Sequence, residues 1–422
     1  MRKKIFITNN VQKRRKRLSF RGINNFMRKM VHKKLHSLCE GSIEIVEEGS
    51  KKVFGNTDGA LKATISVYSP KFYSLLVTRG SVGALESFID GHWYCDDLVA
   101  LSRILIRDDT ATNHLEKGFA ILSKPLLWLY IHLNPNTKSG SQRNIRAHYD
   151  LSNDFFKLFL DKTLTYSCAF FSKPNMSLKA AQIEKLDRLC RKINLSAQDS
   201  LLEIGTGWGS FAIHAAKKYG CSVTTTTISK EQFYFASEKV REAGLEDKIS
   251  ILRKDYRDLT GTFDKLVSIE MIEAVGPQFM PTFIKKCSSL VKPDGLIAIQ
   301  GITISDQDFQ QYIRGTDFLR KYIFPGGSLI SISQINEHFK NFTDMRFVHL
   351  EDITHHYALT LREWRKRFNI KLDNVYSLGF SKSFCRLWEF YLASCEAAFL
   401  ENHIGDVQMI FARPERDTTI IY

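Results

Sequence analysis

The stretch that most constrains the fold runs from residue 199 to residue 232 and reads DSLLEIGTGWGSFAIHAAKKYGCSVTTTTISKEQ. It opens as an apolar strand at 201–204, turns through glycines at 205–209, and enters an amphipathic helical pattern at 211–218. A second strand-like run follows at 222–228. Glycines remove Cβ atoms where backbone must approach a ligand, and the start of the next helix presents N–H groups to it. The pattern predicts a nucleotide-binding β–α–β unit.

The spacing of the glycines helps to choose the nucleotide. A dinucleotide fingerprint reads G-x-G-x-x-G, but residue 210 is Ser, so this turn reads G-x-G-x-G. The second strand ends in Thr226, Thr227 and Ser229, without the acidic residue that usually binds the ribose of NAD. Both features weigh against NAD and favour S-adenosylmethionine. The turn alone leaves open an ordinary glycine-containing connection between a strand and a helix.

Further strand-like and helical patterns extend this unit along the chain. Strands are expected at 249–253, 263–270, 296–303 and 406–413, and helices at 177–193, about 230–244 and about 278–291. Residues 306–405 are expected to be mixed helix, after which the last strand rejoins the edge of the sheet. The alternation predicts an α/β fold with a Rossmann-like, doubly wound, mostly parallel sheet, and a ligand at the carboxyl ends of its strands.

A segment rich in Pro, Gly, Asn and Ser, residues 133–143, is the clearest linker in the chain. Residues 1–21 before it are expected to be a disordered basic arm, and residues 22–132 a small α+β domain. In that domain we expect strands at 42–47, 51–55 and 63–68, followed by a helical pattern over 69–105. Residues 144–422 form the nucleotide-binding domain.

The positive charge of the chain is concentrated at its N-terminus. The net charge is +15, and residues 1–39 hold 13 Lys and Arg with no Asp or Glu, which leaves +2 for the remainder. Such an arm attracts anionic lipid or nucleic acid, or is a solvated tail with no specific partner. Apolar residues from 23 to 38 recur with a helical period opposite a basic face. This helix is expected to lie on an anionic membrane or to pack on its own domain.

The eight cysteines are scattered without a C-x-x-C pair, which favours free thiols in a cytosol-like compartment and argues against structural zinc. His355 and His356 lack a partner at ligand spacing, so no metal site is expected. No apolar run reaches the ~20 residues of a membrane span, so any membrane association is expected to be peripheral. The Arg-rich N-terminus is also compatible with an organelle transit sequence.

Few residues point to chemistry by their pattern alone. Glu270 and Glu273 follow a strand at the edge where this sheet type places ligand-facing groups, although an acidic residue there also suits the start of a helix. Cys168, Tyr357 and Cys395 are isolated, and a lone Cys is more often buried core. Aromatic residues at helical spacing between 384 and 399 suit either a core or an apolar channel.

Seven blocks in order resemble the cyclopropane-fatty-acyl-phospholipid synthase family, which includes the mycolic acid cyclopropane synthases. They are AHYDLSNDFFKLFLDKTLTYSCAFF, LLEIGTGWGSFAIHAAKKYG, TISKEQ, SIEMIEAVG, FLRKYIFPGG, YALTLREW and FYLASCEAAF. The resemblance covers nearly the whole chain from about residue 30, and ESFIDGHWYCDDL is similar to the N-terminal domain of the longer, phospholipid-using members. It implies a class I methyltransferase domain with acyl-binding insertions at 144–422.

The resemblance also assigns roles to residues. The residues expected to surround S-adenosylmethionine are Tyr166, Ser167, Glu203, Gly205, Gly207, Gly209, Thr227, Gln232, Asp255 and Tyr256. The residues that correspond to the family's bicarbonate pocket are Cys168, Glu270, Ile302 and Tyr357. Cys395 matches a Cys near the acyl tunnel, and Gln300 stands where the family usually has His. A Gln amide donates a hydrogen bond to an anion but is never cationic, which bears on anion binding and on deprotonation.

The resemblance implies methyl transfer from S-adenosylmethionine to the cis double bond of unsaturated phospholipid acyl chains, as in a cyclopropane-fatty-acyl-phospholipid synthase. Bound bicarbonate or Glu270 would deprotonate the resulting carbocation so that the ring closes. The alternatives are a methyl- or methylene-branching fatty-acid enzyme, a small-molecule N-methyltransferase, and a non-catalytic lipid-binding protein. We expect the protein to be cytoplasmic and held at the inner face of an anionic phospholipid membrane, without nucleic acid. A homodimer is left open.

Overall fold

The computed structural model describes residues 22–108, 137–138, 141, 151–315 and 317–414. The expected arm at 1–21 and most of the expected linker at 133–143 lie outside the described residues, so both remain predictions. The chain divides into two compact units. The first comprises residues 1–127 and 380–397, and the second comprises residues 128–379 and 398–422.

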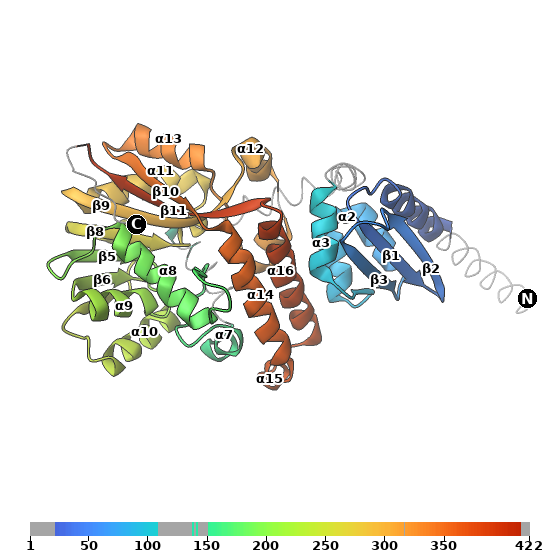
Figure 1. Ribbon diagram of the computed structural model, residues 1–422, viewed down its shortest axis with the longest axis horizontal. Helices are drawn as coiled ribbons and strands as arrows, with labels where there is room; N and C mark the ends of the chain where they lie inside the picture. Colours follow the sequence, from blue (N-terminus) through green and yellow to red (C-terminus); the bar gives the residue numbers. More distant parts are fainter. Residues whose placement is uncertain (1–21, 109–136, 139–140, 142–150, 316, 415–422) are drawn as a thin grey trace, which may run out of the picture. The chain divides into compact units, whose positions relative to one another are not determined.

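The first unit is built on a four-stranded sheet with the strand order β2-β1-β3-β4 (Figure 1). Its elements are β1 (Ser42–Glu47), β2 (Ser50–Gly55), β3 (Lys62–Val67), α2 (Lys71–Ile89), β4 (Trp93–Cys95) and α3 (Leu98–Arg107), with a helix over residues 22–35. The expected α+β class is confirmed, but the helical expectation for 69–105 is wrong at β4. Gly91, at φ 71°, follows the end of α2, and the chain then pairs antiparallel with β3.

The two halves of the helix over residues 22–35 differ in burial. Val31 and Leu35 are buried, so the second half packs on its own unit. Ile23 and Phe26 are 50% and 61% exposed, so the first half presents apolar side chains to solvent. Lys29 on the same helix is also exposed. The apolar residues of this helix are therefore more buried in its second half and more exposed to solvent in its first half.

Residues 380–397 join the first unit from late in the chain. They make up most of helix α16 (Lys382–Leu400). The ring of Phe390 lies 5.7 Å from that of Phe88 on α2, and Arg386 Nη1 donates a hydrogen bond to the carbonyl of Ile89 at 3.3 Å. Arg386 and Ile89 are 297 positions apart, so local sequence patterns do not reveal this packing.

The second unit is a seven-stranded sheet with the order β10-β11-β9-β8-β5-β6-β7. Its strands are β5 (Ser200–Ile204), β6 (Ser222–Thr226), β7 (Ile249–Leu252), β8 (Phe263–Ile269), β9 (Val291–Ile304), β10 (Arg346–Asp352) and β11 (Ile404–Ala412). The five strands β5 to β9 are joined by parallel pairings, and β11 pairs antiparallel with both β9 and β10. The predicted Rossmann-like, mostly parallel sheet is confirmed.

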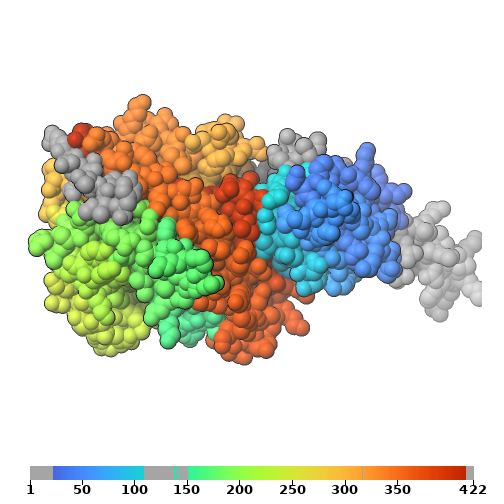
Figure 2. Space-filling view, viewed as in Figure 1, coloured from blue at the N-terminus to red at the C-terminus, as the bar shows by residue number. Residues whose placement is uncertain are grey.

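Helices cover both faces of this sheet. The helices of this unit are α7 (Asn153–Phe159), α8 (Leu178–Lys192), α9 (Ser210–Tyr219), α10 (Lys230–Glu242), α11 (Met280–Ser289), α12 (Asp306–Arg314), α13 (Ile332–Phe342), α14 (Thr354–Ile370) and α15 (Leu372–Ser377). Of these, α8, α9 and α10 pack on one face of the sheet and α11 and α13 on the other. Short 3-10 turns lie at Tyr256–Asp258, Ile272–Ala274 and Pro277–Phe279, and a π-helical turn lies at Leu319–Ile323. In the space-filling view the green atoms of α8 and the yellow-green atoms of α9 and α10 lie at the surface of this unit (Figure 2).

The side chains of the central strands alternate between two hydrophobic cores, as a sheet covered on both faces requires. Leu202 and Leu266 pack with residues of α11 and α13 such as Phe283 and Phe339. Their neighbours Leu201 and Val267 pack instead in the core that α8, α9 and α10 complete. Because successive side chains of a strand point to opposite faces of the sheet, each face has its own core and its own covering helices.

Two expectations for the end of the chain are wrong. Residues 306–405 are not only helix, because they contain strand β10 at the edge of the sheet. The last strand, β11, lies between β9 and β10 and not at the edge. Its register places Gln408 opposite Gln300 and Asp406 opposite Ile302, which matters for the site described below. Among the described residues, no helix is long and apolar enough to cross a membrane.

Candidate active site

A pocket opens at the carboxyl ends of β5, β6 and β8, where the loop after each strand turns over the sheet. Nine of the ten residues expected around the cofactor line it, namely Tyr166, Ser167, Glu203, Gly205, Gly207, Thr227, Gln232, Asp255 and Tyr256. Gly209 is the exception, because it caps helix α9 from behind the turn at φ 90°. A Cβ there would meet the Cβ of Ala236 at 3.3 Å, so Gly209 serves helix packing.

The glycine turn is held to the neighbouring strand by its backbone. The N–H groups of Gly205 and Thr206 both donate to the carbonyl of Thr226 at 3.1 Å. Thr225 Oγ1 donates to Glu203 Oε2 at 2.6 Å, so the carboxyl group lies beneath the turn. Burial raises the pKa of Glu203 to about 8, and the Thr225 hydrogen bond only partly opposes this. The floor of the pocket thus holds a proton that a bound cation would displace.

Polar side chains at the far end of the pocket suit the ribose and the base of a nucleoside. Thr227 Oγ1 donates to Gln232 Oε1 at 2.9 Å, which turns the amide nitrogen of Gln232 away from Thr227. Asp255 accepts two hydrogen bonds from the Arg257 guanidinium, each at 2.7 Å. Burial alone would raise the pKa of Asp255, but these bonds and the Arg257 charge lower it. Asp255 is therefore held as an anion beside Tyr256.

The glycine turn makes a testable prediction for cofactor affinity. In Gly205→Ala a Cβ would meet Met271 at 3.3 Å, at a φ of 105° that L-residues rarely adopt. We expect S-adenosylmethionine to bind at least about tenfold more weakly, because ~1.4 kcal/mol of strain or displacement gives that factor. Gly261→Ala is the matched control, since Gly261 has φ 94° on an exposed loop with nothing within 4 Å. Calorimetric affinities that are equal for the two variants would contradict this prediction.

Glu270 also lines the pocket, directly after the end of β8. Its backbone is left-handed, at φ 46°, which is unusual for a residue with a Cβ and marks a strained position. Its Oε1 accepts hydrogen bonds from Cys168 N and Gln300 Nε2, both at 2.8 Å. Its Oε2 accepts one from Tyr357 Oη at 2.6 Å. The structure thus brings four of the predicted residues together around a single carboxylate.

Two further carboxyl groups complete the cluster. Glu273 Oε1 accepts from Ile302 N at 2.5 Å, and burial, with the nearby charge of Glu270, raises the pKa of Glu273 to about 8. Asp406 Oδ2 accepts from Gln300 Nε2 at 3.1 Å. Burial, followed by the charges of Glu270 and Glu273, raises the pKa of Asp406 well above its usual range. Glu273 and Asp406 are therefore held neutral beside Glu270.

Sequence reasoning left Glu273 open and missed Asp406. Glu273 has a recognisable signal, because it follows Glu270 by three residues and the turn Ile272–Ala274 brings it back to the same edge. Asp406 has none, because only the register of β11 against β9 brings it to the site. Lys185 was also missed: it is fully buried, lines the pocket, and its Nζ donates to Ser167 Oγ at 2.5 Å.

Cys168 takes part through its backbone. Its thiol is buried, and burial raises the thiol pKa well above its usual range, so it is no thiolate nucleophile. Cys395 is buried on the part of α16 that belongs to the first unit, so its expected place near an acyl tunnel remains a prediction. Among the described residues, no group of His, Cys, Asp or Glu is arranged to hold a metal ion.

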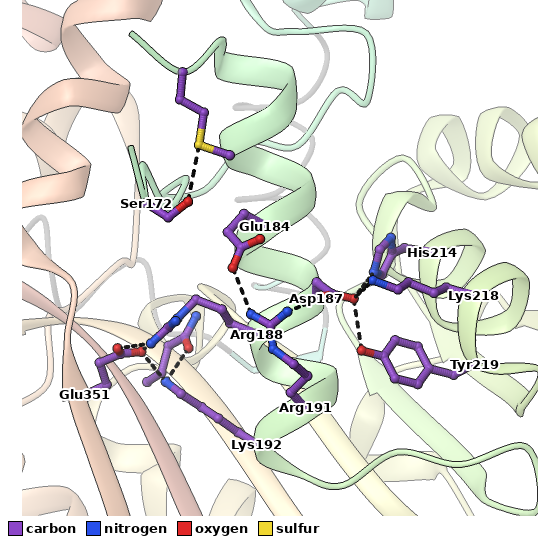
Figure 3. A network of polar contacts seen from close by, with 12 residues as sticks. Ser172, Glu184, Asp187, Arg188, Arg191, Lys192, His214, Lys218, Tyr219 and Glu351 are labelled. Atoms are coloured by element: carbon purple, nitrogen blue, oxygen red, sulfur yellow. Dashed lines mark hydrogen bonds and ion pairs between the residues drawn. The ribbon is translucent and has the colours of Figure 1, made fainter. Parts of the chain in front are cut away.

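A chain of side chains orients Gln300 from behind. Gln300 Oε1 accepts from Gln408 Nε2 at 3.0 Å, and Gln408 Oε1 accepts from Lys192 Nζ at 2.6 Å. Lys192 is also paired with Glu351 at 2.5 Å, and Arg188 of α8 contacts the same carboxylate (Figure 3). Because a Lys can only donate, each amide in this chain has a fixed orientation. Both N–H bonds of Gln300 consequently point at Glu270 and Asp406.

Bicarbonate does not fit the cluster as it stands. The resemblance assigned Cys168, Glu270, Ile302 and Tyr357 to its pocket, and Gln300 stands at the family's His position. The donors that these residues offer in the structure are Cys168 N, Gln300 Nε2, Tyr357 Oη and Ile302 N. The first three donate to Glu270 and the fourth donates to Glu273.

The chain is similar to known proteins over most of its length. The family model described as mycolic acid cyclopropane synthetase matches residues 136–409. A tuberculostearic acid methyltransferase from Mycobacterium tuberculosis is 37% identical over 343 residues, which is 79% of each chain. A cyclopropane-fatty-acyl-phospholipid synthase from Escherichia coli is 32% identical over 359 residues, 84% of this chain and 89% of the other.

Solved structures show the same relationship. The cyclopropane synthase MmaA2 from Mycobacterium tuberculosis superposes with a TM-score of 0.60 at 28% identity, and the match covers 64% of this chain and 98% of the other. The mycolic acid cyclopropane synthase CmaA1, complexed with SAH and CTAB, gives 0.60 at 29% identity over 64% of this chain and 97% of the other. In both cases the match covers nearly all of the solved chain.

Proposed function

Because this chain belongs to the mycolic acid cyclopropane synthetase family and is an S-adenosylmethionine-dependent methyltransferase, we propose that it cyclopropanates unsaturated acyl chains of membrane phospholipids. The observation that carries the proposal is the position of Glu270. It lines the cofactor pocket, and its carboxylate is gathered with the buried groups of the cluster. A methyl donor and a base would therefore share one site.

The chemistry needs both groups. An isolated double bond is a weak nucleophile, so the methyl donor must be a strong electrophile, which the sulfonium of S-adenosylmethionine supplies. The π electrons form a bond to the methyl carbon, the carbon–sulfur bond breaks, and S-adenosylhomocysteine leaves. A carbocation remains on the acyl chain. Glu270 then removes a proton from the new methyl group, and the electrons of that C–H bond close the three-membered ring.

The surroundings of Glu270 suit a carbocation. Tyr357 donates to its carboxylate and lies edge-on to Trp364, with ring centroids 6.2 Å apart. Trp364 also lies 5.1 Å from the ring of Tyr166, which lines the pocket. Aromatic faces and a preorganised negative charge stabilise a developing cation, most strongly where water is excluded.

One experiment separates this proposal from its alternatives. The purified protein is incubated with S-adenosylmethionine and vesicles of unsaturated phospholipid, and the fatty acids are analysed by mass spectrometry. A gain of one CH₂ with loss of the double bond supports cyclopropanation. A gain of CH₂ with a double bond retained supports methylene branching instead. That product forms when the same carbocation loses a proton from another carbon. No lipid product, together with turnover on amines, would refute the proposal.

The proposal extends to the membrane that holds the substrate. The basic residues 1–21 and the exposed Ile23 and Phe26 would bind the anionic surface of a membrane, and the enzyme would work there as a peripheral protein of the cytoplasm. Lipid and not nucleic acid is favoured because the two exposed side chains beside the basic arm are apolar. A homodimer is compatible with this arrangement.

Deleting residues 1–20 is expected to weaken binding to anionic vesicles at low salt. Each Lys or Arg near such a surface contributes about 1 kcal/mol, and salt screens this attraction. The difference between the truncated and full-length proteins should therefore vanish as salt is raised, in a vesicle co-sedimentation assay. The matched control is the double variant Ile23→Ser, Phe26→Ser, whose loss of binding should persist at high salt. A salt-independent effect of the truncation would count against an electrostatic arm.

A further inference from the structure

The carboxylate of Glu270 is an anion bound in an anion site. Its two oxygens take one backbone N–H, one amide N–H and one hydroxyl, from Cys168, Gln300 and Tyr357, at 2.6–2.8 Å. A planar, three-atom O–C–O group that accepts three hydrogen bonds is also what a bound bicarbonate would present. Glu270 therefore supplies, from the chain itself, the group that these donors are built to hold.

The charge of the cluster opposes a second anion. Glu270, Glu273 and Asp406 all lie within it. Lys185, a buried cation whose own pKa is lowered by burial, acts on Glu270 and Asp406. A desolvated bicarbonate would thus meet the charge of the Glu270 carboxylate, while the donors of Cys168, Gln300 and Tyr357 are already taken by that carboxylate.

The position of Glu270 is fixed from two sides. Its strained backbone directs the side chain away from an ordinary helix start, because φ is 46°. The chain from Lys192 through Gln408 to Gln300 holds an amide N–H against Oε1. Strained backbone persists only where the surrounding contacts over-determine it. Here the contacts that hold the strained backbone are the hydrogen bonds to the carboxylate of Glu270, the proposed base.

We infer that Glu270 takes the place of bicarbonate in this protein, so that the enzyme deprotonates its intermediate with a carboxylate of its own and turns over without bicarbonate. This inference rests on the proposed function. In the step itself, Glu270 gains the proton of the new methyl group, the C–H electron pair forms the ring bond, and the positive charge on the acyl chain is lost. Gln300 is a positioning residue, because it acts through Glu270.

The test compares turnover in buffer freed of carbon dioxide with turnover in millimolar bicarbonate. We expect the wild-type rate to be the same in both within about twofold, since removal of a true base lowers rates by ~10²-fold or more. Carbon-13 NMR of labelled bicarbonate, with the protein saturated by S-adenosylhomocysteine, should show no saturable binding. A wild-type rate that collapses without bicarbonate and returns with it would overturn the inference.

A variant provides the complementary arm. Glu270→Ala removes the carboxylate but keeps the three groups that donate hydrogen bonds to it. We therefore expect the rate to fall ~100-fold or more and to be partly restored by added formate or bicarbonate. If neither anion raises the rate while S-adenosylmethionine still binds, the donors do not form an anion site and the inference fails. If no lipid product forms with any protein, the proposed function fails. The NMR measurement needs no turnover and then still decides the question of bicarbonate, because saturable binding to wild type would overturn the inference.

Discussion

Glu270→Gln is expected to lower turnover by about 10²- to 10⁴-fold, the range that loss of a general base produces. Gln preserves the length and shape of the side chain but has no carboxylate to accept the proton. Its NH₂ group would also face Cys168 N, Gln300 Nε2 or Tyr357 Oη, each of which now donates to Glu270. The loss should appear in kcat, with the affinity for S-adenosylmethionine unchanged in calorimetry, because the base acts after the cofactor has bound.

Glu273→Gln is the matched control for this prediction. Glu273 lies three residues further on and its Oε2 is buried, but its raised pKa, about 8, already makes it neutral at pH 7. A neutral amide can replace a neutral carboxyl and still accept from Ile302 N. We therefore expect its rate to fall by less than about tenfold. An equal loss of turnover in the two variants would show that the cluster acts as a unit. It would contradict the role of Glu270 as the base.

Local patterns were sufficient to predict the sheet and its cofactor. The turn at 205–209 and the strands around it obey short-range rules, since apolar alternation fixes a strand and glycine spacing fixes the turn. These rules place the carboxyl ends of β5, β6 and β8 at one edge. They therefore also gather nine of the ten predicted cofactor residues in one pocket.

The carboxyl cluster around Glu270 depends on long-range pairing, which local patterns do not encode. Gln300 and Gln408 are 108 positions apart and meet because β11 inserts between β9 and β10. The sequence interpretation placed that strand at the edge and missed β10, so Asp406 and Gln408 had no predicted neighbours. The resemblance supplied Gln300 as a departure from the family, and only the structure shows which groups its amide contacts.

Cys168 illustrates a second limit. The residue type suggests thiol chemistry, but the structure uses its backbone N–H, which any residue except proline would offer. Glu270 shows the reverse, because its carboxylate is essential to the geometry while its unusual backbone is invisible in the sequence. Side-chain identity therefore predicts a role only where the side chain itself makes the contact.

The stability of the cofactor-free protein is expected to fall steeply between pH 6.5 and pH 8. Burial raises the pKa of both Glu203 and Glu273 to about 8 from the ordinary 4.5. In this interval the folded state keeps two protons that the unfolded state has already lost, so the free energy of unfolding decreases as pH rises. The contribution of each group is complete below pH 4.5 and is lost as pH passes 8. Over the interval each carboxyl removes roughly 2 kcal/mol.

Other groups leave this window clear. Histidines that are buried in neutral form, such as His32 and His214, increase stability as pH rises, but mainly below the ordinary histidine pKa of 6.5. Burial lowers the pKa of Lys192 to about 8, against the pull of Glu351, so its own increase in stability falls mainly above that pH. Burial also lowers the pKa of Lys185, which opposes the fall in stability. Asp406 has a raised pKa and acts in the same direction as the two glutamates. The slope therefore reports the buried carboxyl groups.

Urea unfolding at pH 6.5 and pH 8 measures the effect. Glu203→Gln and Glu273→Gln each replace a buried acid with a neutral group of the same shape, so each should remove its share of the slope and leave a protein more stable than wild type at pH 8. S-adenosylmethionine should also flatten the slope, because its sulfonium favours the ionised form of a carboxyl that lines the pocket, and Glu203 does. If the wild type and both variants lose stability equally between pH 6.5 and pH 8, the protons that cause the slope are not those of Glu203 and Glu273. A flat wild-type profile would mean that water reaches both carboxyl groups and that the base works in a wetter site than the one described.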